Sequence, residues 1–367
     1  MKKFIKFESR FPDYSVDRYF ITETRLILLN ITNLEKIDTQ KMYKIYDNWP
    51  KIAKTYFEKN VKKIEISEIN QIIFAGMGGS GVIGDVFSAI LSKTNIHVSV
   101  VKGYHLPKTV DSNTLVVAIS ISGNTDETLR FLESAKKHHD CKLIVFTAGG
   151  RMEQFCLEKE IEFRKIEKYH SPRASFPSFL YSILNILSPI SPIKNEDVYE
   201  SIKNLEEIKK EISSENISKN NPSLLLAEWI TDIPLIYYPW GLESSAIRFK
   251  NSLQENAKTH VIIEDVVESC HNGIVAWEKK SNVQPIMLRG TDDHIKTKEK
   301  YEILSTYFQE NNIDFKEIYS VKGSILSKII SLIYLLDYAA IYKSIMDEID
   351  PSPVKSIEYI KNKIKLD

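Results

Sequence analysis

Short apolar runs alternate with longer amphipathic runs over the first half of this chain. Apolar runs of five or six residues predict buried strands at 71–75, 97–101, 114–119 and 142–146. Apolar positions at helical spacing predict helices at 42–56, 82–91, 125–138 and 176–187. Strands that alternate with helices in this way favour a parallel sheet covered by helices on both faces.

A break in this pattern divides the chain in two. The segment Ser188-Pro189-Ile190-Ser191-Pro192 interrupts both helix and strand, so we place a domain boundary there. After a polar helix at 197–214, the alternation resumes with elements at 233–238, 244–257, 283–288, 297–310, 315–321 and 325–346. The predicted fold class is α/β, with two tandem doubly wound parallel αβα sandwich domains at 37–188 and 195–367, after an N-terminal extension at 1–36.

The length of the chain and its charge limit the number of domains and the kinds of partner that we expect. A chain of 367 residues exceeds the usual size of one hydrophobic core, which favours two domains. Lys plus Arg and Asp plus Glu both number 49, so nucleic acid and anionic membranes are not expected partners. The most apolar stretch, 325–342, is interrupted by Lys328 and Asp337 and falls short of the ~20 apolar residues of a membrane span. It predicts a buried core helix.

The cysteines argue against a disulfide framework and a zinc site. There are three of them, Cys141, Cys156 and Cys270, without CxxC spacing or neighbouring histidines at ligand spacing. The N-terminal residues lack an apolar run long enough for a signal peptide. We therefore expect a cytoplasmic protein with no metal.

The first motif with chemical meaning is Gly76-Met77-Gly78-Gly79-Ser80-Gly81, between a predicted strand and a predicted helix. Glycines allow close approach of a ligand to the backbone, and a helix N-terminus favours anions. The motif also contains GxGxxG, but a nicotinamide site requires an acidic residue about 20 positions later. The chain has Val100-Val101-Lys102-Gly103 there, and a purely structural tight turn remains another reading.

The second motif is Ser120-Ile121-Ser122-Gly123-Asn124-Thr125-Asp126-Glu127-Thr128, again between a strand and a helix. The hydroxyls of Ser120, Ser122 and Thr125, together with helix N-terminal amides, would suit a phosphate monoester. Asn124 or Ser122 could instead serve as an ordinary helix N-cap, and the two roles are compatible.

The two motifs together resemble the signature of sugar-isomerase (SIS) domains. From about residue 38, the chain resembles the archaeal-type bifunctional phosphoglucose/phosphomannose isomerases, which carry two such domains. The matching segments continue along the chain: Ser171-Pro172-Arg173-Ala174-Ser175, Gln254-Glu255-Asn256-Ala257-Lys258, Cys270 to Trp277, Asp350-Pro351-Ser352-Pro353-Val354 and Ile360-Lys361. Residues 1–36 lie outside the resemblance.

The resemblance implies an aldose–ketose isomerase that interconverts glucose 6-phosphate, fructose 6-phosphate and mannose 6-phosphate through a cis-enediol. It implies a homodimer with a shared active site, in which one subunit's phosphate site comprises Gly79, Ser80, Ser120, Ser122 and Thr125. Proton transfer alone interconverts aldose and ketose, so no cofactor is expected.

The resemblance also assigns the catalytic roles. Arg173 would stabilise the enediolate, and Glu255 would move the proton between C2 and C1. His271, from the neighbouring subunit, and Lys361 would open the sugar ring. A carboxylate near a helix C-terminus is disfavoured by the helix dipole, as expected for a general base with a raised pKa. Judged without the resemblance, these four residues would be a surface arginine, a solvated glutamate, a structural histidine and a solvated lysine.

Three departures from the family pattern leave substrate preference open: Ile121 for tyrosine, Ser175 for alanine and Ala276 for glycine. Ser352 is a candidate hydroxyl near the sugar 2-position, although an ordinary turn serine would look the same. Two alternatives remain, namely an SIS isomerase of another sugar phosphate and a non-catalytic sugar-phosphate sensor.

Overall fold

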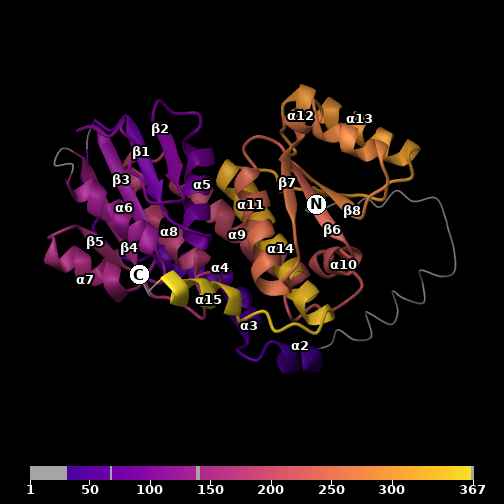
Figure 1. The fold of residues 1–367 in the computed structure, drawn as a ribbon, viewed down its shortest axis with the longest axis horizontal. Coiled ribbons are helices and arrows are strands. Elements are labelled where there is room, and N and C mark those ends of the chain that lie inside the picture. The colour runs from indigo at the N-terminus through magenta and orange to yellow at the C-terminus, as the bar shows by residue number, and fades with distance from the viewer. Residues whose placement is uncertain (1–30, 67, 138–140, 365–367) are drawn as a thin grey trace.

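The computed structural model describes residues 31–66, 68–137 and 141–364 (Figure 1). The predicted extension at 1–36 therefore lies almost entirely outside the described residues. Its last part forms helix α2 (Ile31–Ile37), followed by α3 (Met42–Asp47) and α4 (Trp49–Phe57). The single helix predicted at 42–56 is thus wrong, because Asn48 ends α3 and Pro50 occupies the first turn of α4.

The first sheet is parallel and has the strand order β2-β1-β3-β4-β5. Its strands are β1 (Gln71–Ala75), β2 (His97–Val101), β3 (Thr114–Ser120), β4 (Lys142–Thr147) and β5 (Phe163–Lys165). Its helices are α5 (Gly79–Leu91), α6 (Asp126–Lys137), α7 (Gly150–Glu158) and α8 (Phe176–Ile186). In β3, Leu115 and Val117 join one core cluster, while Ala118 joins another on the opposite face, so both faces are buried.

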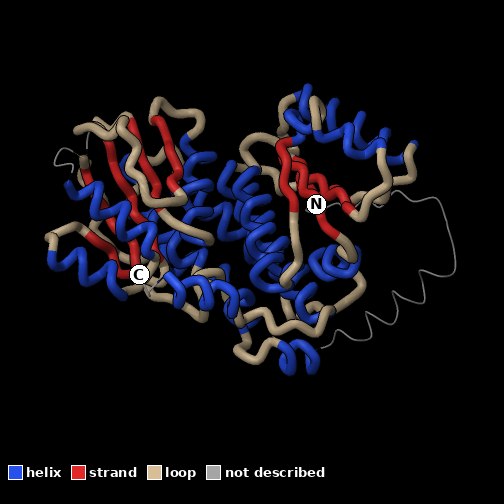
Figure 2. The backbone as a smooth tube through the Cα atoms, viewed as in Figure 1, coloured by secondary structure: helices blue, strands red, loops and turns tan. Residues whose placement is uncertain are grey.

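The second sheet repeats the arrangement with the order β7-β6-β8-β9. Its strands are β6 (Ile233–Tyr238), β7 (Ile262–Asp265), β8 (Val283–Arg289) and β9 (Lys316–Tyr319). Its helices are α9 (Asn195–Ile212), α10 (Pro222–Trp229), α11 (Glu243–Ser252), α12 (Val266–Ser269), α13 (Ile295–Glu310), α14 (Ile325–Met346) and α15 (Lys355–Ile364). Figure 2 shows the strands of each sheet flanked by helices.

Helices between the two sheets form one continuous core. Helix α14 packs against α9, α10 and α11, while α4 packs against both α8 and α9. The largest cluster of buried apolar residues accordingly includes side chains from both halves of the chain. Helix α14 has the length and composition of a membrane span, but 89% of its most apolar window is buried inside the protein. It is the core helix that the sequence predicts.

Candidate active site

The two predicted motifs meet at the carboxyl edge of the first sheet. Strands β1 and β3 are neighbours, and the Ser80 hydroxyl accepts a hydrogen bond from the Ile121 backbone N–H at 3.3 Å. Gly79 lies against domain two, since a Cβ there would sit 3.2 Å from Nη1 of Arg248. The glycine loop therefore contacts both the second motif and the other half of the chain.

The three hydroxyls of the second motif form one cluster. The Ser120 hydroxyl donates to Thr125 Oγ1 at 3.1 Å, and Ser122 Oγ lies 3.4 Å from the same atom. Gly123 allows the tight turn, because its φ is +69° and a Cβ would lie 1.7 Å from the Gly149 carbonyl oxygen. The structure thus brings Gly79, Ser80, Ser120, Ser122 and Thr125 to one edge of the sheet.

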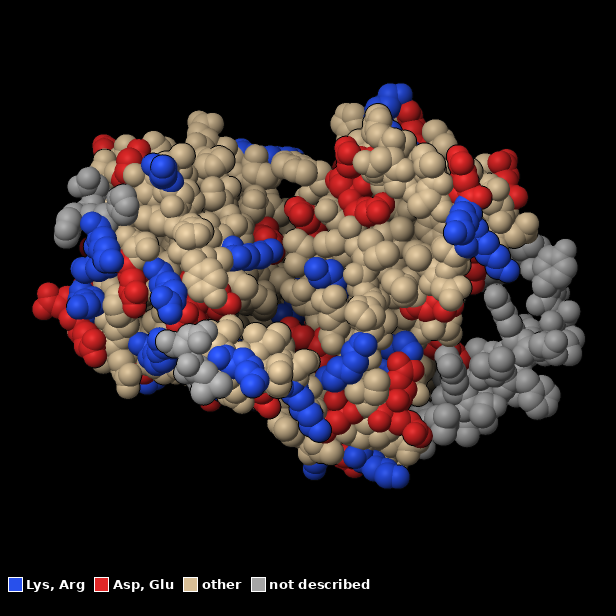
Figure 3. All heavy atoms as spheres, viewed as in Figure 1, with Lys and Arg blue, Asp and Glu red and all other residues tan. Residues whose placement is uncertain are grey.

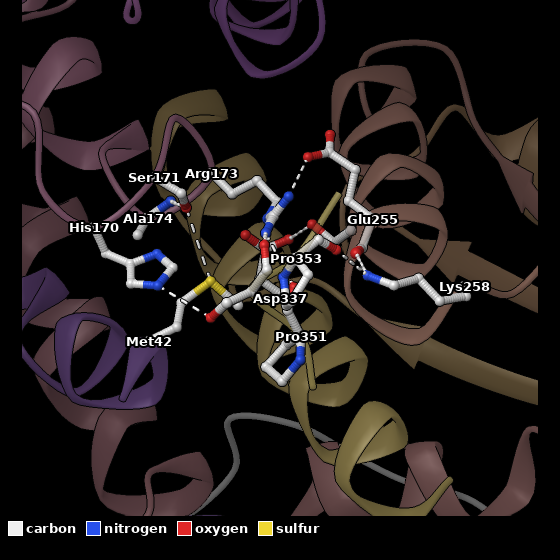
Figure 4. Close-up of polar contacts among 12 residues, drawn as sticks. Met42, His170, Ser171, Arg173, Ala174, Glu255, Lys258, Asp337, Pro351 and Pro353 are labelled. Carbon is white, nitrogen blue, oxygen red and sulfur yellow. Dashed lines mark hydrogen bonds and ion pairs between the residues drawn. The ribbon is translucent and has the colours of Figure 1, made fainter. Parts of the chain in front are cut away.

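Arg173 and Glu255 form an ion pair between the two domains. Arg173 Nη1 donates to a carboxylate oxygen of Glu255 at 2.5 Å, and the Arg173 side chain is only 5% exposed (Figure 4). Its Nη2 donates to the carbonyl oxygens of Pro351 and Ser352 at 3.0 and 3.1 Å. The guanidinium therefore faces inward, as the preceding Pro172 permits, and is held in one orientation.

Glu255 lies on a π-helical turn, Leu253–Ala257, that continues α11. Such turns are rare inside helices and occur frequently at functional sites. A buried ion pair supports this turn: Asp337 accepts from Nη2 of Arg248 at 2.7 Å and from the Ser252 hydroxyl at 2.5 Å. Arg248 Nη2 also donates to the Arg173 carbonyl oxygen at 2.8 Å, so one buried network fixes both members of the Arg173–Glu255 pair.

A cavity of about 630 Å³ opens beside Glu255. Gly78 lines one side, and Glu255 and Lys258 line another. The segment Pro353 to Ile357, which leads into α15, also lines the cavity. The glycine loop and the Glu255 carboxylate therefore share one cavity between the two domains, large enough for a small-molecule ligand.

Lys361 and His271 occupy different places relative to this cavity. Lys361 is exposed on α15, one helical turn beyond the cavity-lining Ile357 and on the same helix face, about 6 Å along the axis. His271 is exposed in the second domain, directly after α12. Among the described contacts, its side chain has none with Arg173, Glu255 or Lys361.

Comparisons with known proteins follow the same division of the chain. Residues 65–156 match the SIS domain model, and residues 219–364 match the model of the bacterial phospho-glucose isomerase C-terminal SIS domain. The bifunctional phosphoglucose/phosphomannose isomerase of Caldicellulosiruptor bescii is 31% identical over 333 residues, covering 87% of this chain and 97% of that protein. This chain belongs to the bifunctional phosphoglucose/phosphomannose isomerase family.

Two further proteins that are similar to this chain show that the fold occurs in enzymes with other names. A D-glucosamine-6-phosphate 4-epimerase of Sulfolobus acidocaldarius is 27% identical, over 67% of this chain and 77% of that protein. The solved structure of Escherichia coli tagatose-6-phosphate ketose/aldose isomerase superposes with a TM-score of 0.62 at 15% identity, covering 91% and 95% of the two chains. Together, the matches confirm the predicted α/β fold, the SIS domains and the isomerase class of enzyme.

The structure adds residues to this isomerase's cavity that the sequence did not single out. Lys258 has a left-handed φ of 57°, and its Nζ donates to the carbonyl oxygens of Glu255 at 2.5 Å and Pro353 at 2.8 Å. Burial, and then the nearby Arg173 charge, lower the pKa of Lys258. Lys258 belongs to the Gln254–Lys258 motif, so the sequence could have indicated this residue. Its contact with Pro353 joins residues 95 apart, which no local pattern in the sequence predicts.

His170 is a second residue near Arg173 that the sequence did not single out, although it does not line the cavity. Its Nε2 lies 3.1 Å from the Ser352 hydroxyl, and burial followed by the Arg173 charge lowers its pKa. Ser352, the candidate hydroxyl near the sugar 2-position, is thus held next to the arginine rather than turned to solvent. Within the described residues, no group of three or more His, Cys, Asp or Glu side chains is arranged to hold a metal ion.

Proposed function

We propose that this protein interconverts glucose 6-phosphate and fructose 6-phosphate, and also accepts mannose 6-phosphate, through a shared cis-enediol. The observation that carries the proposal is the Arg173–Glu255 ion pair, 2.5 Å long, beside a cavity shared with the glycine loop. A carboxylate base next to a buried permanent cation suits proton abstraction alpha to a carbonyl. The name of the Caldicellulosiruptor bescii relative supports the same two activities.

The phosphate group binds to the hydroxyl cluster at the sheet edge. Ser122 and Thr125 offer hydroxyl donors, and the first turn of α5 offers the Gly79 backbone N–H and the Ser80 hydroxyl. The Ser80 N–H already donates to the Met77 carbonyl oxygen at 3.1 Å. No lysine or arginine is needed as a direct partner, because neutral donors and helix dipoles already favour an anion. From this cluster the sugar chain extends past Gly78 into the cavity that Glu255 lines.

Glu255 takes a proton from C1 or C2 and returns it to the neighbouring carbon. The negative charge that develops on the enediolate oxygens is stabilised by Arg173, whose buried Nε has no hydrogen-bond partner and remains able to donate. The hydrogen bonds from Arg173 to the carbonyls of Pro351 and Ser352 keep the guanidinium in place through the reaction. The protein then needs no metal or redox cofactor.

Ring opening requires proton transfer at the ring oxygen and the anomeric hydroxyl, which we assign to His271 and Lys361. Lys361 approaches from α15 on the face that lines the cavity. His271 has no contact with Glu255 in its own chain, which supports its supply by the second subunit of a cytoplasmic homodimer. Mannose 6-phosphate differs only at C2, and we assign the Ser352 hydroxyl, which lies 3.1 Å from His170 Nε2, as the candidate group near that position.

The test is a coupled assay of fructose 6-phosphate consumption with EDTA present. The wild-type protein is expected to be active, and Glu255→Gln should reduce kcat by about 10²–10⁴-fold while sugar-phosphate affinity changes by less than about tenfold. Glu196→Gln, on the exposed first turn of α9, is the matched control and should be unchanged. Turnover of another sugar phosphate alone, or tight binding without turnover, would favour a different SIS isomerase or a sensor.

A further inference from the structure

The two domains present equivalent corners to each other. The first four strands of each domain, counted along the chain, have the same order in their sheet. The helix that follows the first of these strands is α5 in one domain and α11 in the other. These two helices pack together. The glycine loop before α5 faces the end of α11, which forms the cavity with Glu255. Because the two domains are equivalent in this respect, the same packing predicts a second cavity where the loop before α11 faces the end of α5.

The structure contains this second cavity, with a volume of about 280 Å³. Its walls are the end of α5, the start of β2, and the turn Trp240–Gly241 with the first residues of α11. The volume lies near the lower limit for small-molecule pockets, which suits one monosaccharide ring. No role in the isomerase reaction falls on these residues.

Two side chains at this cavity lack the partners expected in a merely structural surface. Ser244 is 1% exposed and lines the cavity, yet its hydroxyl has no hydrogen-bond partner among the residues that the structure describes. An unpaired buried hydroxyl is unfavourable, and a bound ligand would supply the missing hydrogen-bond partner. Trp240, in contrast, is 72% exposed at the mouth. An exposed indole beside polar groups is typical of surfaces that bind the apolar face of a sugar or an organic cation.

This cavity differs in charge from the phosphate site, whose hydrogen-bond donors are neutral. Asp85 pairs with Lys102 at 2.7 Å, so these two charges balance. Glu243 also lines this cavity and forms no ion pair among the described residues. Burial, followed by the Asp85 charge, raises its pKa, while the Lys102 charge and a hydrogen bond with Tyr238 act in the opposite direction. His97, the remaining titratable group in the lining, is exposed, with its Nε2 3.3 Å from the Ser99 hydroxyl. The cavity thus carries one carboxylate in excess and repels a phosphate.

We propose that this second cavity is a binding site for a small polyhydroxylated monocation, of the amino-sugar class. The ammonium group pairs with Glu243, the Ser244 hydroxyl bonds a ring hydroxyl, and Trp240 covers the apolar face of the ring. The site is separate from the isomerase cavity, so its occupancy does not depend on the proposed catalytic function.

The test measures D-glucosamine binding to the full-length protein by calorimetry and saturation-transfer NMR at pH 7. Saturable binding is expected, and glucose 6-phosphate at saturating concentration should not displace it. Glu243→Gln should weaken binding at least tenfold, as expected for the loss of a charged hydrogen bond. Trp240→Ala should weaken binding about two- to fivefold, as expected for the loss of an exposed contact with an aromatic face. Glu255→Gln and the matched control Glu196→Gln should leave glucosamine affinity unchanged.

Three outcomes would overturn the proposal. The first is the absence of saturable binding to the wild-type protein at about 50 mM glucosamine, which is roughly 50-fold above a dissociation constant of 1 mM. The second is displacement by glucose 6-phosphate or loss in Glu255→Gln, either of which would locate the amino sugar in the isomerase cavity. The third is a change of oligomeric state in Trp240→Ala, which would make this tryptophan an interface residue. Because Glu243→Gln is nearly isosteric, a folded protein is available even if Trp240→Ala unfolds.

Discussion

The buried Asp337–Arg248 pair offers the sharpest test of how the fold holds the active site. Asp337 is fully buried and accepts hydrogen bonds from Arg248 at 2.7, 2.9 and 3.2 Å and from the Ser252 hydroxyl at 2.5 Å. The Arg248 side chain is 1% exposed, so neither charge can be solvated if its partner is removed. Asp337→Ala would therefore leave the Arg248 guanidinium buried without its partner, next to the space that the Asp337 carboxylate had filled.

The expected loss in the free energy of unfolding is about 3–5 kcal/mol, the usual cost of leaving one buried charge unpaired. The loss should lie toward the lower end of this range, because Arg248 retains two other contacts. Its Nη2 donates to the Arg173 carbonyl oxygen at 2.8 Å, and its guanidinium carbon lies 4.8 Å from the centre of the Phe176 ring. The double variant Arg248→Met/Asp337→Leu removes both charges and retains apolar volume. It should be more stable than Asp337→Ala, since replacing a buried pair by apolar residues is often neutral.

Urea unfolding at pH 7, followed by fluorescence and circular dichroism, measures both variants against the wild type. The largest cluster of buried apolar residues spans both domains, which predicts coincident transitions by the two probes. A loss below about 1 kcal/mol in Asp337→Ala would refute the reasoning, because it would match an exposed ion pair instead of a buried one. A double variant as unstable as the single one would refute the claim that the unpaired charge is the cause.

Three further predictions address the site. Ser122→Ala and Thr125→Ala should each weaken 6-phosphogluconate binding by about 1.5–3 kcal/mol without loss of stability, and unchanged affinity in both by calorimetry would move the phosphate site elsewhere. Mixing His271→Ala chains with Glu255→Gln chains should restore isomerase activity in heterodimers, whereas activity no higher than either parent would indicate a site within one chain. Burial lowers the folded-state pKa of His170 below its ordinary 6.5, so its contribution to stability is present above that pH and lost as pH falls. His170→Gln should then lose less stability than wild type between pH 7 and pH 5, and equal losses in urea titrations would contradict this.

Local patterns in the sequence were sufficient for most of the fold. Strand β3 reads as an apolar run and is fully buried, and the breaks at Gly76–Gly81 mark a true strand-to-helix turn. Strand β7 and helix α15 were not predicted, since β7 is short and half-exposed and α15 has no buried residue. Periodicity detects an element through the face that it buries, so elements with little burial give a weak signal.

The site was only partly visible in the sequence for a related reason. The hydroxyls of Ser120, Ser122 and Thr125 lie within six residues, and one turn brings them together. The Arg173–Glu255 pair joins residues 82 apart, which only the packing of the two domains determines. The π-helical turn at Leu253–Ala257 shifts the register of one helix locally, and an ordinary helical pattern does not reveal it.

The most direct test of the central claim is incubation of fructose 6-phosphate with the protein in D₂O, followed by NMR of both aldose phosphates. Proton transfer through Glu255 and a shared enediol predicts that glucose 6-phosphate and mannose 6-phosphate both form, with deuterium at C2 in the fraction of turnovers in which Glu255 exchanges its proton with solvent. Glu255→Gln should form neither at a comparable rate. Formation of glucose 6-phosphate alone at long times would remove the mannose activity. Absence of both aldoses, with a folded wild-type protein, would contradict the account.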